Sequence, residues 1–192
     1  MSSSAAINEP LLSPSAFVHV VLRTTKSHFQ PMVQYYKTFL GADAAYENEY
    51  VSFLRYDEEH HRIGIISIPQ TDPKAPTTCG LEHIAFSFNN LKDLALSYQQ
   101  KKAHGITPFW CVNHGPATSL YYKDPDGNKI ETQVDNMTSE EGTAFMKTPE
   151  FAVNPMGVDF DPEELVRRLE SGESEASIKV RPKSGPRAFP DF

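Results

Sequence analysis

The sequence predicts an α+β protein in which one βαβββ unit occurs twice, followed by a C-terminal extension. Three observations predict this architecture. Short apolar, β-branched runs alternate with one amphipathic helical pattern in each half of residues 16–136. The two halves align with each other, and His83 falls on the position of His19. The offset of 64 residues is too long for a solenoid, so it fits a duplicated module whose apolar sheet faces must be buried.

The first module is expected at residues 16–70. Residues 17–22 are apolar and β-branched, which predicts a strand buried on both faces. Apolar residues recur at spacings of three and four over residues 29–40, which predicts a helix with Ser27 as its N-cap and Gly41 at its end. Two further strands are predicted, at residues 50–56 and 62–68.

The second module, expected at residues 80–136, repeats this order. A strand at residues 81–88 precedes a helix at residues 91–103, which Gly105 ends. Two further strands follow, at residues 119–123 and 129–134. A tight turn at residues 124–127 joins them. The strand pairs of the two modules align without a gap, residues 52–63 with residues 119–130.

Two terminal segments flank the modules. Residues 1–15 are rich in Ser, Ala, Asn and Pro, which predicts a flexible arm. Residues 137–192 form the C-terminal extension. A short helix is predicted there near residues 161–171, with Asp161 as its N-cap.

Composition narrows the classes of function. The 192 residues carry a net charge of −7, so no general basic field attracts nucleic acid. Two cysteines, Cys79 and Cys111, cannot make a disulfide scaffold. No apolar run approaches the ~20 residues of a membrane span, and residues 1–14 lack the pattern of a secretory signal. The sequence therefore predicts a cytoplasmic globular protein that binds neither nucleic acid nor membrane.

One histidine in each module lies inside a predicted apolar strand, and these two, His19 and His83, occupy equivalent positions of the repeat. A buried imidazole needs a polar partner, and a single one is most often a hydrogen-bonded core residue. Two at equivalent positions favour a shared metal ion instead. Alternation along residues 129–134 turns Glu131 away from the apolar face. Glu131 is therefore either the third ligand or a solvated edge carboxylate.

Two imidazoles and one carboxylate suit a divalent metal ion of intermediate hardness. On octahedral Fe(II) they leave about three positions open, so a substrate and O2 can bind the same ion. On Zn(II) the same ligands leave one position, for a water nucleophile. The repeat places Gly64 at the position of Glu131, and Ile66 and Ile68 cannot coordinate, so the first module offers no fourth ligand.

Several residues of the second module resemble the signature of a known family. They follow one another at fixed spacings: Val112-Asn113-His114, Leu120-Tyr121, Asp124-Pro125-Asp126-Gly127 and Glu131. Over residues 16–135 the chain resembles the vicinal oxygen chelate (glyoxalase/bleomycin resistance/dioxygenase) superfamily, and within it the single-domain type I extradiol ring-cleavage dioxygenases. The resemblance implies one open, U-shaped mixed β-barrel around a metal, which is Fe(II), with Mn(II) as the alternative. It also implies an enzyme that cleaves a catechol-type ring with O2.

The resemblance also assigns catalytic residues. His61, the second histidine of a pair after a predicted strand, would exchange protons with the diol. His114 and Tyr121 would hydrogen-bond the reacting oxygen. Strand parity alone does not decide between Tyr121 and Tyr122, so the choice of Tyr121 rests on the resemblance. Relatives of this kind further imply a homodimer or a higher homo-oligomer.

Two other functions fit the same residues. A Zn, Mn or Ni lyase, isomerase or hydrolase would use the same three ligands and would turn over without O2. A non-catalytic module that binds an aromatic ligand would bind it stoichiometrically in the absence of metal. For such a binder, replacing His19 by Ala would leave ligand binding unchanged.

Overall fold

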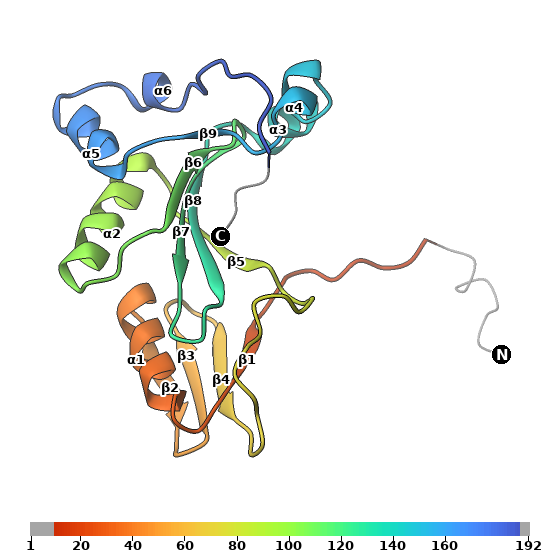
Figure 1. Cartoon of the computed structure of the whole chain (residues 1–192), viewed down its shortest axis with the longest axis vertical. Coiled ribbons are helices and arrows are strands. Elements are labelled where there is room, and N and C mark those ends of the chain that lie inside the picture. Colours follow the sequence, from red (N-terminus) through yellow and green to blue (C-terminus); the bar gives the residue numbers. More distant parts are fainter. Residues whose placement is uncertain (1–9, 189–192) are drawn as a thin grey trace.

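Two mixed β-sheets, one from each half of the chain, form the framework of the computed structural model, which describes residues 10–188 (Figure 1). The first module contains β1 (Val20–Thr24), α1 (Phe29–Leu40), β2 (Asp43–Glu47), β3 (Val51–Arg55) and β4 (Ile63–Ser67). The second module contains β5 (His83–Ser87), α2 (Leu91–Ala103), β6 (Trp110–Asn113), β7 (Ala117–Lys123) and β8 (Lys129–Asp135). The predicted fold class, an α+β protein with a duplicated βαβββ unit, is therefore confirmed.

A C-terminal extension follows β8 and adds short helices and one more strand. Its elements are α3 (Ser139–Phe145), α4 (Pro149–Val153), β9 (Val158–Asp159), α5 (Pro162–Glu170) and α6 (Glu175–Ile178). β9 pairs with β6, so the order of the second sheet is β5-β8-β7-β6-β9, whereas the first sheet has the order β1-β4-β3-β2. The helix predicted near residues 161–171 is confirmed as α5, and the Asp161 side chain caps it by accepting from the Glu163 N–H.

The register of the two sheets supports the duplication. In each module the first strand pairs in parallel with the last, so Val20 lies opposite Ile63 and Ile84 lies opposite Ile130. In the repeat, Ile84 is the equivalent of Val20, and Ile130 is the equivalent of Ile63. Both modules thus build the same strand–helix–strand core around their first and last strands.

The ungapped alignment of the two strand pairs is wrong by one residue in β7. Phe53 lies opposite Gly64, and Tyr121 lies opposite Glu131. Tyr121 is therefore the counterpart of Phe53 rather than of Leu54, because the chain has one residue more between the paired Leu54 and Ile63 than between the paired Tyr122 and Ile130. Gly64 does occupy the place of Glu131, as the sequence predicts.

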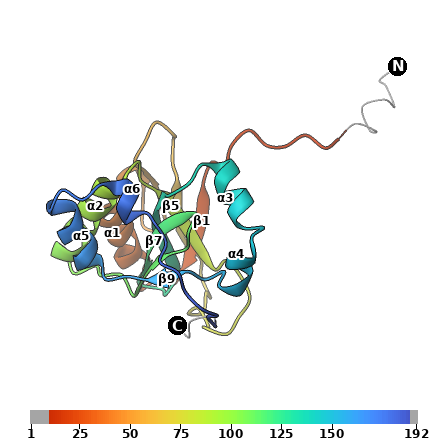
Figure 2. The same cartoon turned by 90° about the horizontal axis from the view of Figure 1, so that it is seen from above.

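Each sheet is packed against a helix on one face. Met32 and Tyr36 of α1 and Leu94 of α2 are buried in the core between helix and sheet. α1 and α2 lie on the same side of the molecule, whereas α3 and α4 lie on the other side, beyond the end of the second sheet (Figures 1 and 2). Val21 of β1 and Ala85 of β5, which are repeat equivalents, are both exposed on the opposite faces. We call these opposite faces the open faces of the sheets.

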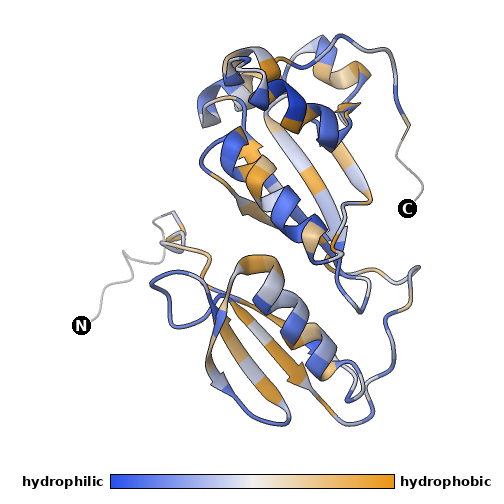
Figure 3. Cartoon of the chain, turned by 90° about the vertical axis from the view of Figure 1, so that its left-hand side faces the viewer, coloured by the Kyte–Doolittle hydropathy of each residue, from blue (hydrophilic) through white to orange (hydrophobic). Residues whose placement is uncertain are grey.

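The two modules meet end to end, through α1 and the turn between β7 and β8. The Tyr36 hydroxyl donates a buried hydrogen bond to Oδ2 of Asp124, 3.0 Å away. The Phe39 ring packs edge-to-face on the Tyr122 ring, with centroids 5.1 Å apart. Figure 3 shows the resulting arrangement from the helix side, with one module above the other. These contacts fix the orientation of the two modules relative to each other.

The prediction for the first strand needs correction. β1 begins at Val20, so His19 precedes the strand instead of lying inside it. Phe17 and Val21 are 77% and 44% exposed, although a strand buried on both faces is expected there. That expectation is wrong because, in the described part of the chain, no second layer covers the open face of β1.

The ends of α1 follow the prediction in part. Gly41 ends the helix in a left-handed conformation with φ of 61°, and its N–H bonds the Lys37 carbonyl. The prediction of Ser27 as the N-cap is wrong: His28 occupies that position. The Ser27 hydroxyl pairs with the Thr25 hydroxyl instead of a helix N–H.

Segments outside the predicted elements show further differences. The predicted N-terminal arm falls partly on residues 1–9, which lie outside the described residues, and residues 10–19 contain neither helix nor strand. The sequence does not predict β2, β6, α3 or α4. Of the helices between residues 10 and 188, none combines the length and the apolarity that crossing a membrane requires.

Candidate active site

A buried carboxylate lies on the open face of the second sheet. Oε2 of Glu131, on β8, is 3.0 Å from Nε2 of His83, the first residue of β5, and Glu131 is only 5% exposed. The His83 ring stands edge-on to the Tyr121 ring of β7, with centroids 5.4 Å apart. Strand order produces this cluster, because β8 lies between β5 and β7 and Glu131 lies opposite Tyr121.

His114, which follows β6, holds the Tyr121 hydroxyl. Nδ1 of His114 is 2.7 Å from the Met156 carbonyl oxygen, and Nε2 is 3.0 Å from the Tyr121 hydroxyl. A carbonyl oxygen only accepts, so Nδ1 carries a proton and donates. Burial lowers the pKa of His114, which favours a neutral ring whose Nε2 accepts from the Tyr121 O–H. Tyr122, the alternative left open by strand parity, lies instead in the core against Phe39.

A loop of the C-terminal extension presents the Met156 carbonyl to His114. Asn154 organises this loop: its side chain accepts from the N–H groups of Met156 and Gly157 and donates to the Gly157 carbonyl. Gly157 has φ of +100°, and a Cβ on it would lie 2.4 Å from the carbonyl oxygen of Asn113. The sequence predicts no role for these residues, and the local signal for the loop is the turn-forming Asn-Pro dipeptide before Met156.

The extension also fixes an aromatic surface beside Tyr121. The Trp110 ring of β6 stacks on the Tyr121 ring, with centroids 4.7 Å apart and planes 23° apart. The Trp110 indole N–H donates to Oδ1 of Asp159 at 2.7 Å, and Arg187 binds the same carboxylate through two hydrogen bonds. A rigid aromatic surface next to hydrogen-bonding groups suits a flat aromatic ligand.

The predicted site residues of the first module form a separate cluster. The His19 ring stacks on the His61 ring with centroids 4.4 Å apart, and His61 stacks on His60 at 4.5 Å. Phe53 of β3 contacts His61, with centroids 4.7 Å apart. Burial lowers the pKa of His61, and the neighbouring imidazoles His19 and His60 lower it further.

In the cluster of His83, Glu131 and Tyr121, the surroundings favour an ionised Glu131 carboxylate beside a protonated Tyr121 hydroxyl. The hydrogen bond with Glu131 raises the pKa of His83. Burial raises the pKa of Glu131, but the hydrogen bond and the positive charge of His83 outweigh burial, so the net shift of this pKa is downward. Burial raises the pKa of Tyr121, and the charge of Glu131 raises it further, so its hydroxyl keeps its proton at neutral pH.

The donor chemistry fits a divalent metal ion, but a single chain does not gather all three predicted ligands. His83 and Glu131 present an imidazole and a carboxylate side by side, as such an ion requires. His19 lies in the other cluster, with His61. Within residues 10–188 of one chain, no three side chains of His, Cys, Asp or Glu lie close enough together to hold one ion.

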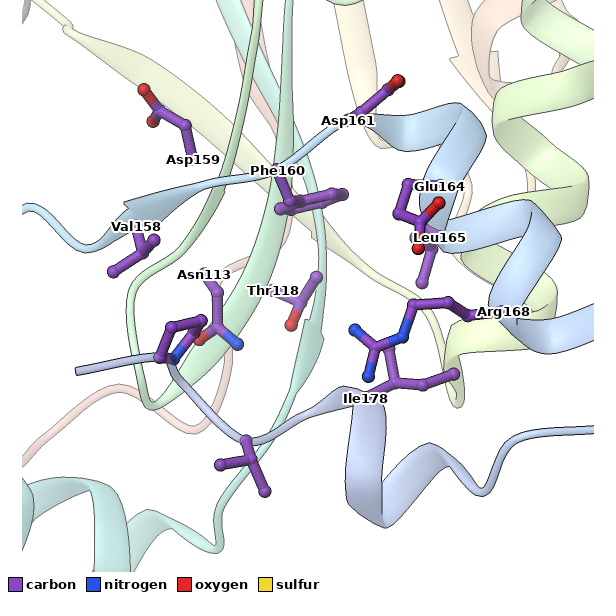
Figure 4. Close-up of a pocket in the computed structure, with 12 residues that line it drawn as sticks. Asn113, Thr118, Val158, Asp159, Phe160, Asp161, Glu164, Leu165, Arg168 and Ile178 are labelled. Carbon is purple, nitrogen blue, oxygen red and sulfur yellow. The ribbon is translucent and has the colours of Figure 1, made fainter. Parts of the chain in front are cut away.

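A second hollow, under the extension, does not compete with this site. Figure 4 shows a cavity of about 80 Å³ between β6, β7, α5 and α6, lined by Asn113, Thr118, Leu165, Arg168 and other residues. A space of that size holds only a few water molecules. The Arg168 guanidinium there is already bound to Glu173, with Nε 2.7 Å from its carboxylate.

Comparisons with solved structures support the fold. A lactoylglutathione lyase from Agrobacterium tumefaciens is 18% identical and has a TM-score of 0.51, over 63% of this chain and 94% of that chain. A glyoxylase/bleomycin resistance protein/dioxygenase domain from Frankia sp. EAN1pec is also 18% identical with a TM-score of 0.51, over 68% of this chain and 99% of that chain. At these identities the likeness concerns the fold alone.

Comparisons with known sequences identify the family as well as the fold. The chain is 44% identical over 158 residues to Biphenyl-2,3-diol 1,2-dioxygenase 2 of Rhodococcus globerulus, covering 81% of this chain and 82% of the relative. It is 41% identical over 166 residues to Biphenyl-2,3-diol 1,2-dioxygenase 3 of the same organism, covering 85% and 86%. Residues 16–132 match the family model of the Glyoxalase/Bleomycin resistance protein/Dioxygenase superfamily. The resemblance found in the sequence is thereby confirmed, and the chain belongs to the Glyoxalase/Bleomycin resistance protein/Dioxygenase superfamily.

Proposed function

We propose that this chain is an extradiol dioxygenase, which opens the ring of a catechol-type aromatic diol with O2 and uses Fe(II) as its metal. One observation carries the proposal: the buried Glu131–His83 pair lies beside the Tyr121 hydroxyl in a chain 44% identical to a biphenyl-2,3-diol 1,2-dioxygenase. The name of that relative specifies an aromatic diol as its substrate. A diol of this class is therefore the proposed substrate here.

His19, His83 and Glu131 are the proposed metal ligands. When bound, Fe(II) would supply a Lewis acid that lowers the pKa of a diol hydroxyl and a redox-active centre for the reaction with O2. The buried charge of Glu131 favours a cation at this place, and the exposed edge of His83 leaves an approach from solvent. The Trp110 and Tyr121 rings beside them form the surface against which an aromatic ring is oriented.

Tyr121 and His114 together accept and donate hydrogen bonds at the bound diol. With His114 neutral, the proton of Tyr121 points to Nε2, so the phenol oxygen accepts from a diol hydroxyl. When His114 gains a proton, Nε2 donates to the phenol oxygen, because Nδ1 stays bound to the Met156 carbonyl. The Tyr121 O–H is then free to donate to the oxygen on which charge develops.

His61 is the proposed proton acceptor for the second diol hydroxyl. An imidazole titrates near neutral pH, so it can take a proton from the diol and return it later in the reaction. His61 stacks directly on the proposed ligand His19, so it lies next to the place where a bound diol would sit. Its partner in the stack, His60, is more exposed and is held by Glu59 at 3.1 Å.

Oxygen uptake tests the proposal. The protein is loaded with Fe(II) without air and mixed with catechol or biphenyl-2,3-diol, and O2 consumption and yellow ring-opened product are followed. We expect O2 uptake that requires both Fe(II) and the diol, is abolished by Glu131→Gln, and is retained by Glu58→Gln, a change at an exposed position. Absence of uptake across a panel of diols, or turnover without O2, would contradict the proposal.

A further inference from the structure

A cleft on the helix side of the molecule lies outside the candidate active site. Its volume is about 630 Å³, and it is lined by the C-terminal end of α1 and by α2, two helices that Figure 3 shows one above the other. Both modules contribute to it, through residues such as Phe39, Tyr56, Phe86, Phe88, Leu96 and Lys101. Thr132 lines it too, whereas its neighbour Glu131 belongs to the open face, because successive residues of a strand point to opposite sides. The cleft and the candidate active site therefore lie on opposite faces of the second sheet.

Aromatic side chains from both modules line this cleft. Tyr56 of the first module packs edge-to-face on Phe86 of the second, with centroids 6.0 Å apart, and Tyr56 is 44% exposed. Phe86 and Phe88 are only partly buried. Leu96 of α2, which is 53% exposed, extends the apolar surface. Exposed apolar side chains gathered in a cleft of this size are typical of a site for a small ligand.

Lys101 of α2 places an ammonium group at this aromatic wall. It is 5% exposed, and its Nζ lies 4.5 Å from the centre of the Phe39 ring and 5.5 Å from that of the Phe88 ring. Burial lowers the pKa of Lys101 to about 8, so the amine still carries its charge at neutral pH. Within residues 10–188 this ammonium donates to one acceptor, the Ser97 hydroxyl, and forms no ion pair. An ammonium has three N–H donors, so two of them lack a partner in that part of the chain.

This charge is unfavourable for the fold alone. A buried cation without a counter-ion destabilises a protein, and aromatic faces compensate it only in part. Asp93 of the same helix also lines the cleft, but its carboxylate accepts from the Asn90 side-chain amide, 2.8 Å away, and forms no ion pair with Lys101. A buried charge that destabilises the fold is typical of a functional site, where activity rather than stability selects the residues. The balancing negative charge is therefore expected from a ligand.

We propose that this cleft binds a small aromatic carboxylate, whose anionic group pairs with Lys101 and whose ring packs against Phe86 and Phe88. A carboxylate has one negative charge, which balances the single charge of Lys101, and its two oxygens accept from the N–H donors that lack a protein partner. A flat ring matches aromatic walls and loses little conformational entropy on binding. The inference goes beyond the dioxygenase activity and does not depend on it, since none of the proposed metal ligands lines the cleft.

A ligand in this cleft contacts both modules. Phe39 and Tyr56 belong to the first module, whereas Phe88 and Lys101 belong to the second. The ligand therefore adds a contact between two units that must otherwise hold together through their own side chains. Because it binds the folded chain and not the unfolded one, it should also raise the temperature of unfolding.

Calorimetric titration of the full chain tests the inference with a matched pair of ligands, 2-naphthoate and the uncharged 2-naphthamide. We expect the Kd of the carboxylate to be roughly 10- to 100-fold lower than that of the amide, because a hydrogen bond to a charged group contributes about that much. Acetate, which has the charge but no ring, should bind far more weakly than 2-naphthoate. Absence of 2-naphthoate binding, equal Kd values for the carboxylate and the amide, or acetate binding as tight as that of 2-naphthoate would overturn the inference.

Two lysine variants of the same helix locate the charge that the ligand recognises. Lys101→Met removes the buried ammonium, whereas Lys92→Met removes an exposed one. We expect Lys101→Met, folded by circular dichroism, to bind 2-naphthoate no more tightly than 2-naphthamide. Lys92→Met should keep the wild-type preference for the carboxylate. A Lys101→Met variant that keeps this preference would show that another group binds the anion and would overturn the inference.

Thermal unfolding and competition provide two further readouts on the wild-type chain. A saturating concentration of 2-naphthoate should raise the Tm of the wild type by more than that of Lys101→Met. Catechol added without air to the Fe(II)-loaded protein should leave 2-naphthoate bound, because the cleft and the candidate active site lie on opposite faces of the second sheet. Displacement of 2-naphthoate by catechol would place the carboxylate in the candidate active site and would overturn the inference.

Discussion

The hydroxyl of Tyr121 donates to Nε2 of His114, 3.0 Å away, because Nδ1 of the same ring is committed to the carbonyl of Met156. The tautomer of His114 is thereby set by backbone of the C-terminal extension. The extension, which the sequence describes only as a tail with one helix, is a structural part of the candidate site.

Removing the Tyr121 hydroxyl tests its role in hydrogen bonding. We expect Tyr121→Phe to lower kcat by roughly 10²-fold with little change in KM, because a lost donor to developing charge costs about that much. Metal content should stay at the wild-type level, since Tyr121 is not a proposed ligand. The matched control is Tyr50→Phe at an exposed tyrosine. An unchanged kcat in Tyr121→Phe would exclude the proposed role.

Gly157 tests the link between the extension and His114. A Cβ at this position would lie 2.4 Å from the Asn113 carbonyl oxygen, in a conformation with φ of +100° that L-residues rarely adopt. We expect Gly157→Ala to lower the free energy of unfolding by about 1–3 kcal/mol and to reduce kcat, because the Met156 carbonyl moves away from His114. Gly185→Ala, where a Cβ meets no atom within 4 Å, should change neither quantity. Equal stability of the two variants would contradict this account.

Lys101 gives a test through the pH dependence of stability. It is 5% exposed, and in the described part of the chain it forms no ion pair; its ammonium lies 4.5 Å from the centre of the Phe39 ring. Burial lowers the pKa of Lys101 from 10.5 to about 8. Between these two pH values the unfolded chain binds a proton that the folded chain does not, so the free energy of unfolding rises with pH across this window.

Lys101→Met should remove this effect. At pH 7 the folded wild type carries the cost of a buried charge, so the variant should be more stable by about 1–3 kcal/mol. The difference should shrink as pH rises from 8 toward 10.5. Urea unfolding at pH 7 and pH 10 measures it, with Lys92→Met at an exposed position as the control. A variant less stable than wild type at pH 7 would show that the amine stabilises the fold.

Local sequence patterns predicted the parts of the fold that local interactions determine. The spacing of apolar residues places α1 and α2, and strand alternation turns Glu131 to the open face. β2 escaped prediction because every one of its residues is exposed, so it has no apolar pattern. α3 carried a usable signal, since Thr138 and Glu141 form a capping box.

The arrangement of the site depends on contacts that no local pattern encodes. The repeat makes His19 and His83 equivalent in sequence. The orientation of the two modules relative to each other, however, depends on the contact of Tyr36 with Asp124. The choice of Tyr121 over Tyr122 depends on a single residue of register in β7. The orientation of the modules follows from tertiary packing, so it emerges only from the structure. The resemblance already favours Tyr121, and the register supplies the physical reason for that choice.

The stoichiometry of O2 consumption decides whether the protein is a dioxygenase. The Fe(II)-loaded protein is supplied with a limiting amount of aromatic diol, and O2 uptake, hydrogen peroxide and the ring-opened product are measured together. We expect each diol consumed to take up one O2 and to yield one ring-opened product, without release of peroxide. Product formed without O2, or O2 reduced to peroxide with the ring left intact, would contradict the proposed dioxygenase activity.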